Sequence, residues 1–126
     1  MIKKRVLIVD DVMDWRLTLK GLLVDAGFEV EITGSVQAAL DALTSHHFDL
    51  ALLDIRLDET DEENVDGLNL AYEIRKTDPN MKIIILTGYA TVENVKKAFR
   101  DSFVADFIPK TETADLRKIV QEVLSK

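Results

Sequence analysis

The sequence contains no cysteine. This absence excludes a disulfide-stabilised scaffold, a zinc site with cysteine ligands and a thiol nucleophile, and it fits a reducing, cytoplasmic location, which we expect. No apolar run approaches the roughly 20 residues that cross a bilayer, so we expect no membrane span. The basic and apolar start imitates a signal peptide only briefly, because Asp10 and Asp11 end the apolar stretch after Val9.

Basic residues are in the minority, with 16 Lys and Arg against 23 Asp and Glu, and the formal net charge is −7. An acidic domain repels phosphate backbones, so we expect no direct binding of nucleic acid by this chain. The sequence has 126 residues, of which 47% are hydrophobic. This size and composition are typical of one domain with its own core, and we expect residues 1–126 to form a single domain.

Three short apolar runs stand out: Val6–Val9, Leu50–Leu53 and Ile83–Leu86. Continuous rather than alternating apolarity predicts strands that are buried on both faces, as in a parallel sheet. Two weaker runs predict strands at the edges of that sheet. Apolar and polar residues alternate in Phe28–Thr33, which indicates a half-exposed edge strand, and Phe103–Ile108 is the candidate for the other edge.

Helical periodicity fills the intervals between these runs. Gly27 is placed to end the first helix and Ser35 to cap the second. The apolar stripes lie within Trp15–Ala26, Val36–Leu43, Leu70–Ile74, Val92–Phe99 and Leu116–Leu124. This alternation predicts a single α/β domain with a doubly wound (βα)5 flavodoxin-like fold, whose parallel five-stranded sheet has the strand order 2-1-3-4-5.

Polar side chains follow four of the predicted strands: Asp10 and Asp11, Asp54, Thr87, and Lys110. Ligands of such folds bind at the carboxyl ends of the strands, near the point where the strand order reverses. The first and third strands are neighbours, so three carboxylates are expected to converge there, which requires either protonation or a cation. Oxygen ligands without His or Cys suit Mg²⁺. A carboxylate nucleophile, a metal and fixed donors are the parts that phosphoryl transfer needs.

A single Asp after a strand is usually a turn or helix cap, and a lone Thr or Lys there indicates even less. The functional interpretation depends on the coincidence of complementary groups on neighbouring strands, all at the end of the sheet where this fold binds ligands.

The motifs "VLIVDD", "LALLD", "DGL", "IIILTGYAT" and "FIPK" together resemble the receiver domain of bacterial response regulators of two-component signalling, over essentially the whole chain. The resemblance implies that Asp54 accepts a phosphoryl group from a phosphohistidine on a sensor kinase or phosphotransfer protein. It implies Mg²⁺, or Mn²⁺, held by the side chains of Asp11 and Asp54 and the backbone carbonyl of Arg56, with Asp10 reaching the metal through water.

The resemblance also implies a conformational switch. Thr87 turns its hydroxyl toward the phosphoryl group, Lys110 pairs with that group, and the rotamer of Phe107 follows Thr87. The surface of the fourth and fifth units then controls a downstream protein or output domain. A phosphorylation-dependent homodimer is a further possible form of the output. Arg56 and Tyr89 match positions that flank the path of the hydrolytic water, where they either slow hydrolysis or are ordinary exposed side chains. The resemblance implies a signalling module with autocatalytic phosphorylation and dephosphorylation, not a turnover enzyme.

Three features depart from the family pattern. Pro109 precedes Lys110 instead of following it, so we expect a trans peptide bond after the lysine, because a cis bond without proline is costly. Phe107 lacks the hydroxyl of the more common tyrosine. The segment between Asp54 and Gly67 is longer than usual, and its acidic run over residues 58–66 is either a solvated loop or a lid beside the site.

Two residues near the site have mainly structural interpretations. Asp66 is expected to cap the third helix. Trp15 is expected in the core, from where it can report on a metal one helical turn away.

Other functions are compatible with parts of the sequence. A pseudo-receiver that only binds partners is the main alternative, given the displaced proline. An aspartyl-phosphate phosphatase is less favoured, because Arg56 stands where that chemistry usually needs a second acid. A flavin- or nucleotide-binding module is remote, because no glycine-rich loop follows the first predicted strand.

Overall fold

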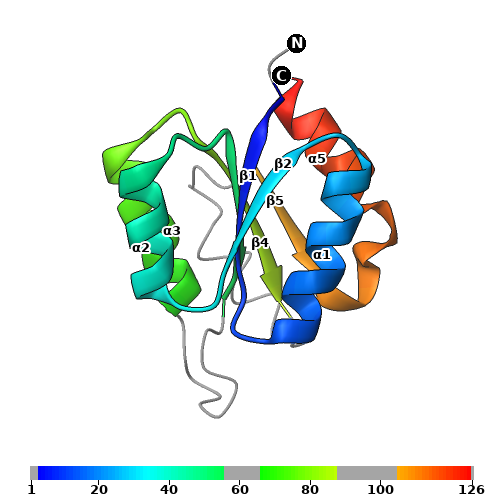
Figure 1. Cartoon of the computed structure of the whole chain (residues 1–126), viewed down its shortest axis with the longest axis horizontal. Helices are drawn as coiled ribbons and strands as arrows, with labels where there is room; N and C mark the ends of the chain where they lie inside the picture. Colours follow the sequence, from blue (N-terminus) through cyan, green and yellow to red (C-terminus); the bar gives the residue numbers. More distant parts are fainter. Residues whose placement is uncertain (1–2, 56–65, 88–104, 126) are drawn as a thin grey trace.

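The computed structural model describes residues 3–55, 66–87 and 105–125. Its centre is one parallel five-stranded sheet (Figure 1). The strands have the order β2-β1-β3-β4-β5. The strands are β1 (Arg5–Val9), β2 (Glu29–Thr33), β3 (Leu50–Asp54), β4 (Lys82–Thr87) and β5 (Asp106–Pro109). The predicted fold class and strand order are confirmed.

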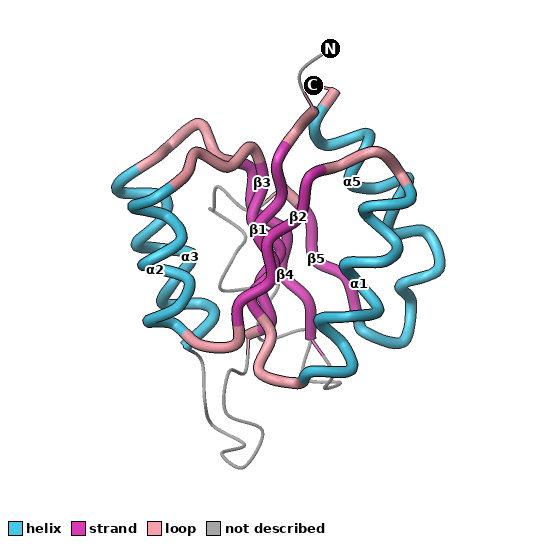
Figure 2. The backbone as a smooth tube through the Cα atoms, in the orientation of Figure 1, coloured by secondary structure: helices cyan, strands magenta, loops and turns pink. Residues whose placement is uncertain are grey.

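Helices cover both faces of the sheet. They are α1 (Met13–Asp25), α2 (Val36–Ser45), α3 (Asp66–Thr77) and α5 (Leu116–Leu124), and a 3₁₀ helix, η1 (Lys110–Asp115), precedes α5. Figure 2 shows α2 and α3 on one side of the sheet and α1 and α5 on the other. The helix predicted within residues 92–99 lies outside the described residues. Among the helices that the structure does describe, none has the length and apolar character of a membrane span.

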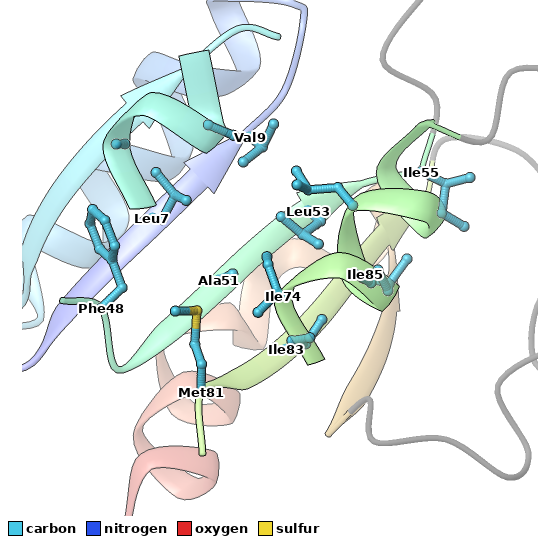
Figure 3. Close-up of a cluster of buried hydrophobic side chains, with 14 residues drawn as sticks. Leu7, Val9, Phe48, Ala51, Leu53, Ile55, Ile74, Met81, Ile83 and Ile85 are labelled. Carbon is cyan, nitrogen blue, oxygen red and sulfur yellow. The ribbon is translucent and has the colours of Figure 1, made fainter. Parts of the chain in front are cut away.

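The core has two halves because successive strand residues point to opposite faces of the sheet. Leu7, Leu53 and Ile85 face α2 and α3, in the cluster drawn in Figure 3, where Phe48 and Met81 close one end. The alternate strand residues form the second cluster with α1 and α5: Val6, Ile8, Leu50, Leu52, Ile84 and Leu86. Burial on both faces explains why these strands read as unbroken apolar runs.

Local signals at the helix ends are largely confirmed. Gly27 follows α1 with φ +97, a conformation that favours glycine. The hydroxyl of Ser35 accepts a hydrogen bond from Ala38 N at 3.1 Å and so caps α2. The prediction for Asp66 was wrong in detail, because it lies in the first turn of α3 and not before it. A carboxylate there still interacts favourably with the helix dipole.

The strand predicted at the β5 edge of the sheet differs from the observed one. The predicted strand Phe103–Ile108 is displaced, because β5 runs from Asp106 to Pro109 and Ala105 precedes it. The pattern misplaced this strand because proline is usually read as a strand breaker, whereas an edge strand accommodates it. No described peptide bond is cis, which agrees with the trans bond expected between Lys110 and Thr111.

Candidate functional site

Three carboxylates converge at the carboxyl ends of β1 and β3. Asp10 and Asp11 follow β1 directly, and Asp54 is the last residue of β3. One oxygen from each of the three carboxylates lies within 4.8 Å of the others. Asp10 is 0% exposed and Asp54 is 2% exposed. The convergence expected from the strand order is therefore present, and two of the three acids are buried.

The backbone around Asp10 is held from three sides. Its N–H donates to the carbonyl of Thr33 at 3.1 Å, and its Oδ1 accepts from Val12 N at 2.9 Å. Its carbonyl oxygen accepts from Nη1 of Arg16 at 2.7 Å. The Arg16 guanidinium lies against Gly34, where an added Cβ would overlap Nη1. These bonds leave Oδ2 as the Asp10 oxygen that faces Lys110.

Lys110 brings the compensating charge from the far edge of the sheet. Its Nζ lies 2.9 Å from Asp10 Oδ2 and donates to Asp54 Oδ2 at 3.1 Å, and the residue is 7% exposed. Burial alone would lower the pKa of this ammonium, but the two carboxylates outweigh that effect and hold the Lys110 pKa above its ordinary value. Lys110 therefore stays charged throughout the neutral pH range.

Among the described residues, the cluster has an excess of negative charge, because its three carboxylates lie near the single ammonium of Lys110. Although Asp10 Oδ2 is within ion-pair distance of Lys110, it accepts no hydrogen bond of good geometry from the described residues. An additional cation is the usual compensation for such a buried excess. The ligands are all oxygen atoms, which suits Mg²⁺ or Mn²⁺ better than a softer metal. The residues present therefore fit a hard divalent cation.

Gly67 packs directly against the strand end that carries Asp54. Its N–H donates to the carbonyl of Ile55 at 2.8 Å. A Cβ added at Gly67 would overlap the carbonyl oxygen of Asp54 and lie 2.7 Å from its carbonyl carbon. The longer segment before Gly67 thus leaves the close approach of α3 to β3 in place, and only glycine fits there.

The other predicted site residues are placed less completely. Thr87 ends β4, where its backbone pairs in register with Pro109 of β5, and Phe107 lies within β5 opposite Ile85. The described part of the chain does not extend to the side chains of Thr87 and Phe107. Arg56, Tyr89 and the acidic run over 58–65 lie outside the described residues. Their predicted roles stay predictions.

Two residues of the site were not predicted in their observed roles. Arg16 fixes the carbonyl of Asp10, and a basic residue one turn past the start of α1 is the only sequence signal for it. Trp15 is half-buried against the core, as expected, but its ring also lies beneath Lys110, with Nζ 5.0 Å from the ring centroid. No sequence pattern indicated that contact.

The amino end of the sheet contains a separate hollow of about 440 Å³, lined by His46, His47, Phe48 and Met81 among others. His47 is exposed and lies 3.7 Å from a carboxylate oxygen of Asp49. The hollow is at the opposite end of the strands from the carboxylate cluster, and in the described residues the grouping of acids that could hold a metal is found at that cluster instead. We therefore take the carboxylate cluster, and not the hollow, as the candidate functional site.

Comparison with known proteins places the chain in a family. The model of the response regulator receiver domain matches residues 6–123. The chemotaxis protein CheY of Thermotoga maritima is 33% identical over 122 residues, which cover 92% of this chain and 97% of that protein. The chain belongs to the response regulator receiver domain family, whose members are signalling proteins of two-component systems.

Longer relatives contain such a domain as one part. The transcriptional regulatory protein ZraR of Escherichia coli is 28% identical over 120 residues, and the match covers 95% of this chain but only 26% of ZraR. The chain thus spans about a quarter of the length of this regulator.

Solved structures agree with the fold. A CheY-like receiver domain protein from Methanospirillum hungatei has a TM-score of 0.85 and 33% identity, covering 98% of this chain and 95% of its own. The response regulator TrrA from Thermotoga maritima, solved in complex with Mg²⁺-BeF, has a TM-score of 0.79 and 30% identity, covering 95% of this chain and 98% of its own.

Proposed function

We propose that the chain is a phosphorylation-controlled switch in which Asp54 accepts a phosphoryl group from a phosphohistidine of a sensor kinase or phosphotransfer protein. The observation that carries the proposal is the placement of the buried Lys110 ammonium, 3.1 Å from Asp54 Oδ2, within a cluster of three carboxylates. A carboxylate at the end of a rigid strand, with a fixed cationic donor beside it, is the arrangement needed to form and hold an acyl phosphate. A cytoplasmic location stays a prediction.

The reaction forms one bond and breaks another. A carboxylate oxygen of Asp54 attacks phosphorus, the P–N bond of the phosphohistidine breaks, and its electron pair returns to the imidazole. Lys110 donates to an oxygen of the transferred group, and the hydroxyl of Thr87 is proposed as a second donor. Asp10, Asp11, Asp54 and the backbone carbonyl of Arg56 would hold a divalent cation, which neutralises the charge that gathers on the phosphoryl oxygens.

The two proposed donors, Thr87 and Lys110, also account for the output of the switch. A phosphoryl group on Asp54 gives Thr87 and Lys110 a new anionic partner, which shifts the equilibrium between two conformations. We propose that Phe107 follows Thr87 and changes the surface near β5 and α5 that a downstream protein or output domain reads. The similar response regulator TrrA was solved in complex with Mg²⁺-BeF, which supports the proposal of a divalent cation at the site.

The first experiment measures whether Asp54 becomes phosphorylated. Intact mass spectrometry after incubation with acetyl phosphate and Mg²⁺ is expected to show one added phosphoryl group in the unmodified chain and none in Asp54→Asn, because the amide is a poor nucleophile. Omission of Mg²⁺ should reduce the adduct strongly, since the cluster then keeps its excess negative charge.

Asp25→Asn is the matched control for this experiment. Asp25 is an exposed carboxylate at the end of α1, so its removal should leave the adduct unchanged. An adduct that persists in Asp54→Asn would refute the assignment of the acceptor. No adduct with acetyl phosphate or with any phosphorylated histidine donor would favour the pseudo-receiver, and sustained release of phosphate from a phosphomonoester would favour the phosphatase.

Divalent cations are expected to stabilise the fold through the carboxylate cluster. A ligand present at about 100 times its dissociation constant adds about 2.7 kcal/mol to the free energy of unfolding, which corresponds to a rise in melting temperature of roughly 10 °C for a domain of this size. Thermal melts with and without Mg²⁺ measure the rise. Asp11→Asn should lose most of it.

Asp14→Asn provides the comparison for the metal experiment. Asp14 is an exposed acid in the first turn of α1, close to Asp11 in sequence but not a member of the cluster. Its removal should leave the Mg²⁺-induced rise intact. An equal loss of the rise in both variants would mean that general negative charge, and not the cluster, attracts the cation.

A further inference from the structure

The ammonium of Lys110 lies over an aromatic ring. Its Nζ lies 5.0 Å from the centroid of the Trp15 ring, while 2.9 Å and 3.1 Å separate it from the oxygens of Asp10 and Asp54. Trp15 is half-buried and packs against the core cluster that α1 shares with α5. Lys110 is therefore enclosed by two carboxylates and one indole.

The face of an indole ring carries negative electrostatic potential and attracts a cation within about 6 Å, more strongly where water is excluded. Lys110 is 7% exposed, so little water competes for its ammonium. A lysine side chain has four rotatable bonds, and each contact that restricts them reduces the entropy lost when the ammonium binds a further group. The ring is thus placed both to attract the ammonium and to limit where it can lie.

The ring and the acids also belong to one rigid unit. Trp15 lies in the first turns of α1, directly after the loop of Asp10 and Asp11. The neighbouring Arg16 fixes the Asp10 carbonyl by a 2.7 Å hydrogen bond. The position of the indole relative to Asp10 and Asp11 is therefore set by the same short segment and does not depend on the flexible side chain of Lys110.

We propose that Trp15 is a positioning residue for Lys110, which keeps the ammonium beside Asp54 when the carboxylates lose their hold on it. Neutralisation of the cluster by a bound divalent cation weakens the attraction between Lys110 and Asp10, whereas the attraction of the ring for the ammonium does not depend on the carboxylate charge. The lysine then remains close to Asp54 and available to an incoming phosphoryl oxygen. This inference rests on the proposed function.

The test compares phosphorylation rates with acetyl phosphate at saturating Mg²⁺. Trp15→Leu is expected to lower the rate constant about fivefold, the effect of losing one partly desolvated cation–π contact. Trp15→Phe, which keeps an aromatic face, should recover most of the rate. In a Lys110→Met background, Trp15→Leu should have no further effect, because the partner that the ring positions is absent.

A purely structural role of Trp15 would give a different pattern. Leu22→Ala removes another half-buried side chain of α1 that packs on the same core cluster, and it should lower the melting temperature without changing the rate constant. A Trp15→Leu rate equal to that of the unmodified chain overturns the proposal. So does a loss that is equally large in the presence and absence of the Lys110 ammonium.

Fluorescence separates this inference from the proposed function. Trp15 is the single tryptophan of the sequence, and an ammonium held over an indole quenches its emission. In the metal-free protein, Lys110→Met should raise the emission, whereas Lys118→Met, at an exposed position of α5, should not. If the unmodified chain takes no phosphoryl group, the proposed function fails, and the emission of Lys110→Met alone decides whether Trp15 holds Lys110. Unchanged emission overturns the contact.

Discussion

Gly67→Ala is expected to lower the melting temperature by roughly 10 °C. The added Cβ would overlap the carbonyl oxygen of Asp54 and approach the Cα of Ile55 to 2.8 Å. Both neighbours are backbone atoms of a buried strand end and cannot rotate away as a flexible side chain would. Overpacking of this kind costs about 3 kcal/mol, at the upper end of the usual range. Thermal or denaturant unfolding measures the loss.

Gly21→Ala supplies an internal comparison with the opposite sign. Gly21 lies within α1, and a Cβ there would meet nothing within 4 Å. Alanine in an exposed helix position is more favourable than glycine by roughly 0.5–1 kcal/mol, so this variant should melt at a higher temperature. A Gly67→Ala variant that melts like the unmodified chain would show that α3 does not approach β3 as closely as the structure indicates.

Gly67→Ala should also affect the carboxylate cluster. Gly67 accommodates the carbonyl of Asp54, so relief of the overlap requires either α3 or the end of β3 to move. A displaced strand end would change the position of the Asp54 carboxylate relative to Lys110, from which it is now separated by 3.1 Å. We therefore expect Gly67→Ala also to reduce the Mg²⁺-induced rise in melting temperature, even under conditions where the variant is fully folded.

The sheet could be predicted from the sequence because its strands are buried on both faces. Val6–Val9 reads as an unbroken apolar run for that reason, and β2 alternates because it lies at the edge. Once the strand order is predicted, the convergence of Asp10 and Asp54 can be predicted too, since neighbouring parallel strands end at the same edge of the sheet. The membership of the cluster is thus a consequence of topology.

Side-chain direction is what the sequence could not supply. Strand order places the Cα of Lys110 at the end of β5, two strands away from Asp54, but the torsions of a long side chain decide where its ammonium lies. Its contacts with Asp10 and with the Trp15 ring depend on how α1 is rotated against the sheet. Likewise, the length of the segment between Asp54 and Gly67 did not predict the contact between Gly67 and the end of β3. The length of a loop only weakly constrains how close its two ends lie.

Lys110→Met is expected to lower the rate of phosphorylation by acetyl phosphate about 100-fold, the usual effect of removing one donor that stabilises developing charge. Methionine has a similar volume and no charge, so the core can stay filled while the donor 3.1 Å from Asp54 Oδ2 is lost. The rate constant at saturating Mg²⁺ measures the effect. Lys118→Met makes the same chemical change at an exposed position and should react at the rate of the unmodified chain.

The stability of Lys110→Met should depend on the metal more strongly than the stability of the unmodified chain. Without a divalent cation, the carboxylates of the variant lack the Lys110 ammonium, and removal of one partner from a buried ion pair typically costs about 3 kcal/mol or more. With Mg²⁺ present, the cation no longer competes with Lys110 for Asp10 and Asp54, so the Mg²⁺-induced rise in melting temperature should be larger in the variant. A rise equal to that of the unmodified chain, together with an unchanged phosphorylation rate, would mean that the ammonium contributes neither to the charge balance of the cluster nor to phosphoryl transfer.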